Sequence, residues 1–145
     1  MSRAIARVPA DETGGKPVCD TLLLTHEQRK NPSGVFPALR GTVIEFALPR
    51  GIALRHDDLL LLDDGSLIEI VARPEALIEI RAENVTMLAR AAWLLGDHHI
   101  PAELAERRLR VRRSEAVAIL LKPLGVRLAD LEAPFEPEGG AYDHG

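Results

Sequence analysis

PEALIEIRAENVTMLARAAWLLG, residues 74–96, is the stretch that decides the fold of this chain. After Pro74 the sequence alternates strand and helix patterns, and residues 75–81 are predicted to form a strand. Asn84 is a good helix N-cap, and Gly96 is predicted to provide the C-terminal cap. Between them, apolar residues recur at helical spacing: Met87, Leu88, Ala91, Ala92 and Leu95. We therefore place a domain boundary before Pro74.

The rest of the C-terminal half repeats this alternation. The patterns predict a strand at 102–105, a strand at 109–112, a helix from Ser114 to Gly125 and a strand at 126–131. The resulting order, β-α-β-β-α-β, is that of the ferredoxin-like split βαβ unit. We predict a ferredoxin-like domain with a C-terminal tail over residues 74–145. Such a fold hosts many functions and specifies none.

The N-terminal half has a β pattern. Runs of apolar residues predict strands at 4–8, 21–25, 41–48, 59–62 and 67–72, and residues 10–17 are expected to form a loop. Asp64-Gly65 lies between the last two runs and is a strong hairpin signal. We predict a small β-domain over residues 1–73, and the whole chain is assigned to the α+β class.

Composition excludes several classes of protein. The 145 residues contain 18 Lys and Arg against 22 Asp and Glu, a formal net charge of −4, which argues against a nucleic-acid binder. The single Cys19 cannot form an intramolecular disulfide, which favours the cytosol. No signal peptide is recognisable and no run approaches the ~20 apolar residues of a membrane span. We expect a cytoplasmic protein that binds no membrane.

Catalytic machinery is not visible in the sequence. There is no phosphate-binding glycine loop and no serine nucleophile motif, and Asp20 beside Cys19 disfavours a reactive thiolate. Carboxylate pairs such as Asp63-Asp64 are interpreted as solvated charge. The basic run Arg107, Arg108, Arg110, Arg112 and Arg113 is interpreted chiefly as a solvated strand face, with a docking surface for an acidic protein as the second interpretation.

Histidine is the most informative residue type. His98 and His99 are adjacent between Gly96 and Pro101, just past the predicted helix end. Imidazole binds Ni(II), Cu(II) and Zn(II), but adjacent side chains diverge and seldom hold one ion together. From spacing alone, metal binding and exposed or capping histidines both remain open. His26 and His56 are interpreted as surface residues, and His144 as an extra ligand or a tail residue.

Two segments resemble one known family. Residues 88–101, LARAAWLLGDHHIP, are similar to the helix and the Leu-Gly-Asn-Arg-His-x-Pro loop of the urease accessory protein UreE family. Residues 133–142, APFEPEGGAY, are similar to the family's Pro-Phe-x-Pro-Glu-x-Gly-Ala-Tyr ending. Upstream, residues 48–51, 58–65 and 74–75 also fit, so the resemblance spans nearly the whole chain.

The resemblance implies a nickel metallochaperone that catalyses no reaction. In this family a β-domain suited to peptide contacts precedes a ferredoxin-like domain, and two copies of the loop histidine, here His99, face one Ni(II) ion across a homodimer. His144 matches tail histidines that complete the metal sphere. The implied partners are the GTPase UreG and apo-urease. Zn(II) or Cu(II) binding is also expected in vitro, because imidazole sites follow the Irving–Williams order.

The chain also departs from the family pattern. Asp97 and His98 replace Asn and Arg of the loop, so His98 is either an added ligand or a substitute for Arg. Asp57 stands where the family has Gly, which bears on the turn there. The absence of a His-rich tail predicts few metal ions per dimer. Arg113-Ser114-Glu115 stands where some members of the family have a His-x-His pair before the last helix, so a secondary metal site is not expected there.

Two other functions compete with nickel delivery. The first is a metal-free peptide-binding or scaffolding module. The second is a zinc hydrolase, which would need three protein ligands and a general base that the sequence does not offer.

Overall fold

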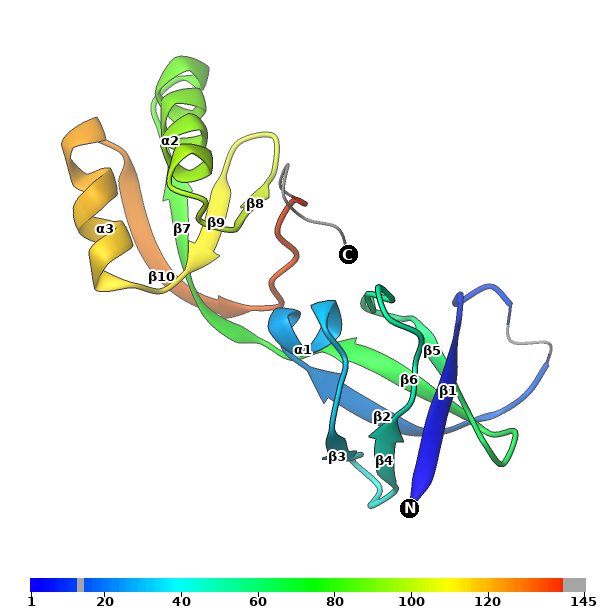
Figure 1. Ribbon diagram of the computed structural model, residues 1–145. Helices are drawn as coiled ribbons and strands as arrows, with labels where there is room; N and C mark the ends of the chain where they lie inside the picture. Colours follow the sequence, from blue (N-terminus) through cyan, green and yellow to red (C-terminus); the bar gives the residue numbers. More distant parts are fainter. Residues whose placement is uncertain (13–14, 140–145) are drawn as a thin grey trace. The chain divides into compact units, whose positions relative to one another are not determined.

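The computed structural model describes residues 1–12 and 15–139, in which Met1–Arg73 and the residues from Pro74 onward form two compact units (Figure 1). The structure contains two sheets and several helices, which confirms the α+β class. Within the described ranges, no helix has the length and apolar character that crossing a membrane requires.

The first unit is built on a six-stranded sheet with the strand order β2-β6-β5-β1-β4-β3. The pairs β1/β4 and β2/β6 are parallel, and the other neighbours are antiparallel. Its elements are β1 (Ser2–Val8), β2 (Val18–Leu24), α1 (His26–Lys30), β3 (Val35–Pro37), β4 (Val43–Phe46), β5 (Leu59–Leu62) and β6 (Leu67–Ala72). Aliphatic side chains such as Leu22, Ile44 and Ile70 fill the core, as the low aromatic content predicts.

Two elements of this unit were not predicted. Helix α1 begins with a capping box, in which the Thr25 hydroxyl accepts from Gln28 N–H (3.4 Å) and the Gln28 side chain accepts from Thr25 N–H (2.9 Å). Strand β3 pairs with β4. Both elements are too short to establish an apolar period, so the sequence pattern did not reveal them.

Two turns depend on a left-handed backbone. The predicted hairpin turn is confirmed between β5 and β6, where Gly65 has φ 87° and Asp64 accepts from Ser66 N–H at 2.9 Å. Asp57 has φ 71°, so it adopts the conformation that a Gly at this position would favour. Its N–H donates to Ile70 O at 2.8 Å, which fixes the turn against β6.

Asp20 is a buried carboxylate in β2, with only 2% of the residue exposed. It accepts from the backbone N–H groups of Thr21 (2.8 Å), Arg40 (2.8 Å) and Thr42 (3.2 Å). Burial by itself would raise the pKa of Asp20, but the hydrogen bonds from Arg40, Thr42 and Thr21 outweigh it and lower the pKa. The carboxylate therefore holds the loop before β4 against β2.

The second unit has a four-stranded antiparallel sheet with the order β10-β7-β9-β8. The elements are β7 (Glu75–Arg81), α2 (Val85–Asp97), β8 (Ala102–Leu104), β9 (Leu109–Arg112), α3 (Glu115–Leu121), the short 3₁₀ helix η1 (Lys122–Leu124) and β10 (Arg127–Ala133). Each strand and helix predicted for residues 75–131 is present, with boundaries shifted by a few residues. Gly125, with φ 71°, ends the second helical segment as expected.

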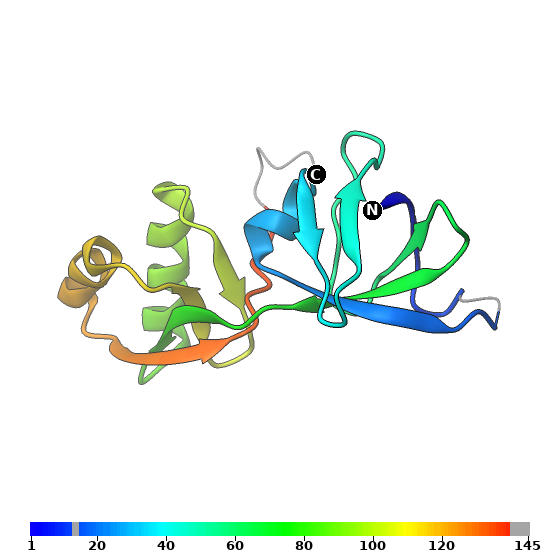
Figure 2. The same ribbon diagram turned by 90° about the horizontal axis from the view of Figure 1, so that it is seen from below.

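Helices α2 and α3 cover one face of this sheet (Figure 2). Ile78, Ile80, Leu109 and Val111 of the strands pack against the helices in one buried cluster with Ala91, Leu95 and Leu121. The apolar face of the helices and the apolar face of the strands thus pack together in a single core.

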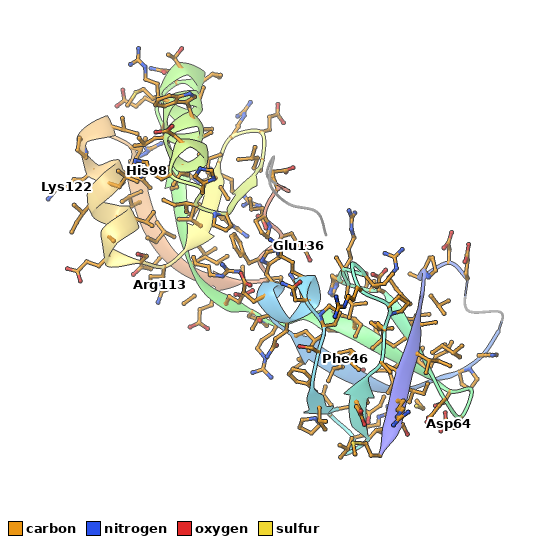
Figure 3. The ribbon with its side chains drawn as sticks, in the orientation of Figure 1. Phe46, Asp64, His98, Arg113, Lys122 and Glu136 are labelled. Carbon is orange, nitrogen blue, oxygen red and sulfur yellow. The ribbon has the colours of Figure 1, made fainter. Side chains whose placement is uncertain are left out.

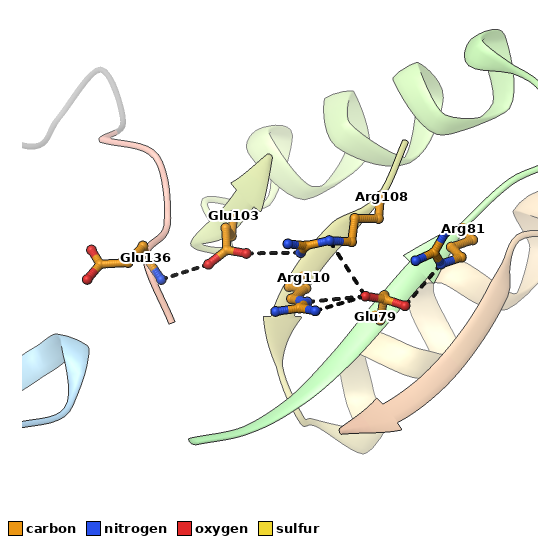
Figure 4. Close-up of polar contacts among 6 residues, drawn as sticks. All are labelled: Glu79, Arg81, Glu103, Arg108, Arg110 and Glu136. Atoms are coloured by element: carbon orange, nitrogen blue, oxygen red, sulfur yellow. Dashed lines mark hydrogen bonds and ion pairs between the residues drawn. The ribbon is translucent and has the colours of Figure 1, made fainter. Parts of the chain in front are cut away.

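The opposite face of the sheet carries an ion-pair array (Figure 4). Glu79 lies 3.0 Å from Arg81, 3.2 Å from Arg110 and 3.7 Å from Arg108, and Arg108 also bonds Glu103 at 3.0 Å. The hydrogen bond from Arg81 is the main cause that lowers the pKa of Glu79, against the opposing effect of burial. The expectation that these arginines form a solvated strand face is wrong for Arg108, Arg110 and Arg112, because carboxylates of neighbouring strands, Glu79, Glu103 and Glu75, pair with them.

Candidate metal centre

Helix α2 ends in a Schellman motif that places His99 in a left-handed conformation. The N–H of Ile100 donates to Leu95 O (2.9 Å), and the N–H of His99 donates to Gly96 O (3.0 Å). His99 has φ 56° and occupies the position after the cap where Gly is usual. Leu95 is buried and the partly buried Ile100 packs against the same cluster, which supplies the apolar contact of this motif.

The prediction that Gly96 caps this helix is wrong. The helix continues through Gly96 to Asp97, and His98 is the C-cap, with φ −88°. With the helix ending at His98, the N–H of Ile100 reaches Leu95 O and the side chain of Ile100 packs against the cluster that contains Leu95. His99 then bears the cost of a left-handed non-Gly residue, about 1–2 kcal/mol. Such strain is common where a side chain has a function.

His98 and His99 are both exposed, as is Asp97 before them. Figure 3 shows His98 at the end of α2, beside the start of β8. The two histidines leave the helix with opposite signs of φ, consistent with the expectation that adjacent side chains diverge. Within residues 1–12 and 15–139, no cluster of three or more His, Cys, Asp or Glu side chains is arranged to hold a metal. His144 lies outside the described residues.

The other two histidines belong to the first unit. His26 is the half-buried first residue of α1. His56 is more than a surface residue, because its Nδ1 accepts from Ala72 N–H at 3.1 Å and its Nε2 lies 3.3 Å from Asp57 Oδ1. An Nδ1 that accepts a hydrogen bond places the ring proton on Nε2, so His56 connects the Asp57 turn to the end of β6.

The segment after β10 runs beside β8, the strand that follows the histidine loop in the sequence. Phe135 is fully buried, Glu136 N–H donates to Glu103 Oε1 (3.0 Å), and Glu138 N–H donates to Ala102 O (2.8 Å). Ala102 follows His99 by three residues. We call residues 134–138 the clasp. Its packing beside β8 was not predicted, although its two prolines, which favour extended backbone, were a signal.

Three large apolar side chains on the helices of this unit, within the described residues, are exposed: Val85, Trp93 and Ile119. Trp93 on α2 is 70% exposed and Ile119 on α3 is 64% exposed. Trp93 precedes His99 by less than two helical turns. Both helices of this unit therefore present exposed apolar side chains.

Comparisons with known proteins identify the family. Residues 2–73 match the family described as UreE urease accessory protein, N-terminal domain, and residues 75–145 match its C-terminal domain. The chain is 43% identical over 127 residues to the urease accessory protein UreE of Beijerinckia indica, covering 88% of this chain and 73% of that protein. The protein of the same name from Rhodopseudomonas palustris is 42% identical over 127 residues, covering 88% of this chain and 59% of the relative.

A third relative, the urease accessory protein UreE of a Bradyrhizobium species, is 39% identical over 142 residues, covering 98% of this chain and 68% of the relative. The chain thus spans between 59% and 73% of the length of these three relatives. The two family matches together cover almost all of the sequence, which confirms the resemblance carried by its helix, loop and tail motifs. The chain belongs to the urease accessory protein UreE family.

Proposed function

We propose that this protein is a nickel-binding metallochaperone that delivers Ni(II) for assembly of the urease active site. The observation that carries the proposal is the position of His99, an exposed imidazole held by a left-handed helix cap at the family's loop motif. A short, hydrogen-bonded cap fixes the backbone of the ligand before metal arrives. In this proposal the protein transfers metal and catalyses no reaction, in keeping with a family of accessory proteins.

A second copy of the chain completes the site in this proposal. One imidazole occupies only one coordination position, and a two-fold axis through the metal would bring His99 of each copy to the same ion. The exposed Trp93 and Ile119 support association of two copies, because a second copy packed on the helix layer would bury their apolar surface. The predicted ion count is therefore one bridging ion per dimer.

His144 is proposed as an auxiliary ligand on grounds of chain length. The clasp fixes Glu138 beside Ala102, three residues from His99. His144 lies six positions after Glu138, and an extended chain of that length spans about 20 Å. The covalent connection thus permits His144 to reach the metal.

His98 keeps two interpretations, an added ligand or a substitute for the family's Arg. Its exposure at the C-cap supports the first interpretation, and the divergence of its backbone from that of His99 supports the second.

Nickel is proposed as the cargo because of the family, not because imidazole selects it. Nitrogen sites bind Cu(II) more tightly than Ni(II), and Zn(II) also binds, so selectivity in a cell comes from metal availability and geometry. A donor protein also benefits from open coordination positions, since an acceptor ligand can enter before the donor ligand leaves.

We infer a homodimer that works in the cytoplasm with the GTPase UreG and apo-urease, in which residues 1–73 provide peptide contacts. For residues 74–145 we infer the ferredoxin-like arrangement. The element order and the antiparallel strand order β10-β7-β9-β8 support it.

The decisive experiment is a calorimetric Ni(II) titration of the wild type, His99→Ala and His26→Gln, with the mass of each measured by light scattering. We expect one tightly bound ion per dimer in the wild type and in His26→Gln, the matched histidine control of the first unit. His99→Ala should lose this ion while remaining a dimer. Unchanged binding in His99→Ala would remove His99 from the site, and no binding by any of the three would overturn nickel delivery.

The alternative function is a metal-free peptide-binding or scaffolding module. It is favoured by exposed apolar side chains on the strands of the first unit, where Ile5 is 44%, Val35 52% and Val43 41% exposed. This alternative predicts partner binding that survives complete chelation of metal and the His99→Ala change. Nickel delivery predicts that transfer to the acceptor fails under both conditions.

A further inference from the structure

A hollow of about 430 Å³ lies at the edge of the second unit where β7 ends and β10 begins. It is lined by Arg81 of β7, the first turn of α2, the loop between β8 and β9, and Arg127 of β10. The histidines lie at the other end of α2, a 13-residue helix that spans about 20 Å. The hollow is therefore distinct from the candidate metal centre.

Three arginines from three separate segments line this hollow: Arg81, Arg107 and Arg127. Arg81 is held by Glu79 at 3.0 Å. In the part of the chain that the structure describes, the side chains of Arg107 and Arg127 form no ion pair, whereas Arg108 and Arg110 of the same basic run are paired across the sheet. Within the basic run, Arg108 and Arg110 are thus paired with carboxylates, whereas Arg107 brings an unpaired positive charge to the hollow.

The first turn of α2 adds no charged side chain to the hollow. The first turn of α2 contains no acidic residue, and the Asn84 side chain accepts from Met87 N–H at 2.9 Å. Beside the arginines, Val85 is 81% exposed and Leu88 is half-buried. The lining therefore combines guanidinium groups with an exposed aliphatic surface.

Two carboxylates, Glu83 and Glu106, also line the hollow and restrict what it can accept. They would repel a continuous polyanion, as would the net charge of −4 of the whole chain. A protein segment can meet this mixed lining, because it places carboxylates opposite guanidinium groups and apolar side chains opposite aliphatic ones. Arginine suits this role, since its planar fork matches a carboxylate.

We propose that this hollow docks an acidic, partly apolar segment of a partner protein, with a carboxylate held by Arg107 and Arg127 and an apolar side chain packed on Val85. The site goes beyond nickel delivery and needs no metal. It can therefore be tested in metal-free protein, where failure of the docking site and failure of the His99 site are separate results.

The test is fluorescence anisotropy of the metal-free full chain with a labelled peptide that alternates leucine and glutamate. We expect saturable binding that weakens at least tenfold in the double variant Arg107→Glu, Arg127→Glu. The matched control is Arg50→Glu, an exposed arginine of the first unit that does not line the hollow. A second probe replaces each glutamate of the peptide by glutamine, and we expect it to bind at least tenfold more weakly.

Val85→Asp tests the apolar contact, and we expect it also to weaken binding of the acidic peptide. The proposal is overturned by absence of saturable binding up to about 1 mM peptide, or by equal losses in the double variant and in Arg50→Glu. Full displacement of the peptide by inorganic phosphate at similar concentration would show a simple oxyanion site and would also overturn it. Circular dichroism of every variant verifies folding, so that a loss of binding reports on the surface.

Discussion

The guanidinium carbon of Arg112 lies 5.0 Å from the centre of the Phe135 ring, and Phe135 is fully buried. Arg112 belongs to β9, whereas Phe135 follows the last strand, so the contact ties the C-terminal segment to the sheet. Glu75 pairs with Arg112 at 3.4 Å and keeps the guanidinium in place. The contact thus anchors the clasp that runs beside β8 toward the histidine loop.

We expect Phe135→Ala to lower the free energy of unfolding by about 3–4 kcal/mol, because a buried ring is replaced by a cavity. Hydrogen exchange of the Glu136 and Glu138 amides should accelerate, since their partners Glu103 and Ala102 lose the anchored segment. Urea unfolding and exchange measured by NMR check both effects. Phe135→Leu is the control, and we expect it to lose less free energy of unfolding than Phe135→Ala. Unchanged hydrogen exchange of the Glu138 amide in Phe135→Ala would contradict the anchoring role.

His99→Gly is expected to be more stable than His99→Ala by about 1 kcal/mol, because Gly adopts the left-handed conformation without a Cβ penalty. Both variants should lose the proposed nickel site, since both lack imidazole. Urea unfolding of metal-free protein and nickel calorimetry measure the two properties on the same samples. Equal stability of the two variants would show that the left-handed cap is not strained in solution.

Nickel binding should weaken as the pH falls from about 8 to about 5.5, because a protonated imidazole cannot ligate and each bound ion releases ligand protons. With two His99 imidazoles per ion the decline should be steeper than for one ligand. Calorimetry in buffers of different ionisation enthalpy counts the released protons directly. A pH-independent affinity over this range would exclude histidine ligation.

Asp20→Asn should destabilise the protein by about 2–3 kcal/mol at pH 7, because the carboxylate accepts from three backbone N–H groups. The pKa of Asp20 is lowered in the folded state, so its contribution is full above the ordinary carboxyl value of 3.8 and is lost as the pH falls through the folded value. The difference in the free energy of unfolding between the wild type and Asp20→Asn should therefore be constant from pH 7 to about pH 5 and should narrow below about pH 4. Urea unfolding at these pH values tests this prediction. A difference in the free energy of unfolding that widens in acid would contradict a lowered pKa of Asp20.

Much of the fold was predictable because its signals are local. Apolar spacing and caps located α2 from Asn84, the hairpin at Asp64-Gly65 and the stop at Gly125. Each depends on residues a few positions apart, for which propensity and periodicity are informative. The histidine loop was likewise identified as the candidate site from its sequence.

Other features depended on residues that the sequence does not bring together. The paired state of Arg108 and Arg110 follows from Glu79 on a neighbouring strand, 29 and 31 positions away. The bond from His56 to Ala72 spans 16 positions and was missed for the same reason. An ion pair between strands requires knowledge of register, and register is set by the packing of the whole sheet.

The sequence by itself determined the order of strands and helices over residues 75–131, the aliphatic core and the family, since these depend on local pattern and on motifs. Only the tertiary structure decided where α2 ends: Gly96 suits a cap, yet the helix continues to Asp97 and Ile100 packs against the cluster that contains Leu95. The helix therefore ends at His98, and the partial burial of Ile100 offsets the strain of the left-handed residue His99. The physical reason is that packing energy is shared among distant residues, whereas helix propensity belongs to each residue alone.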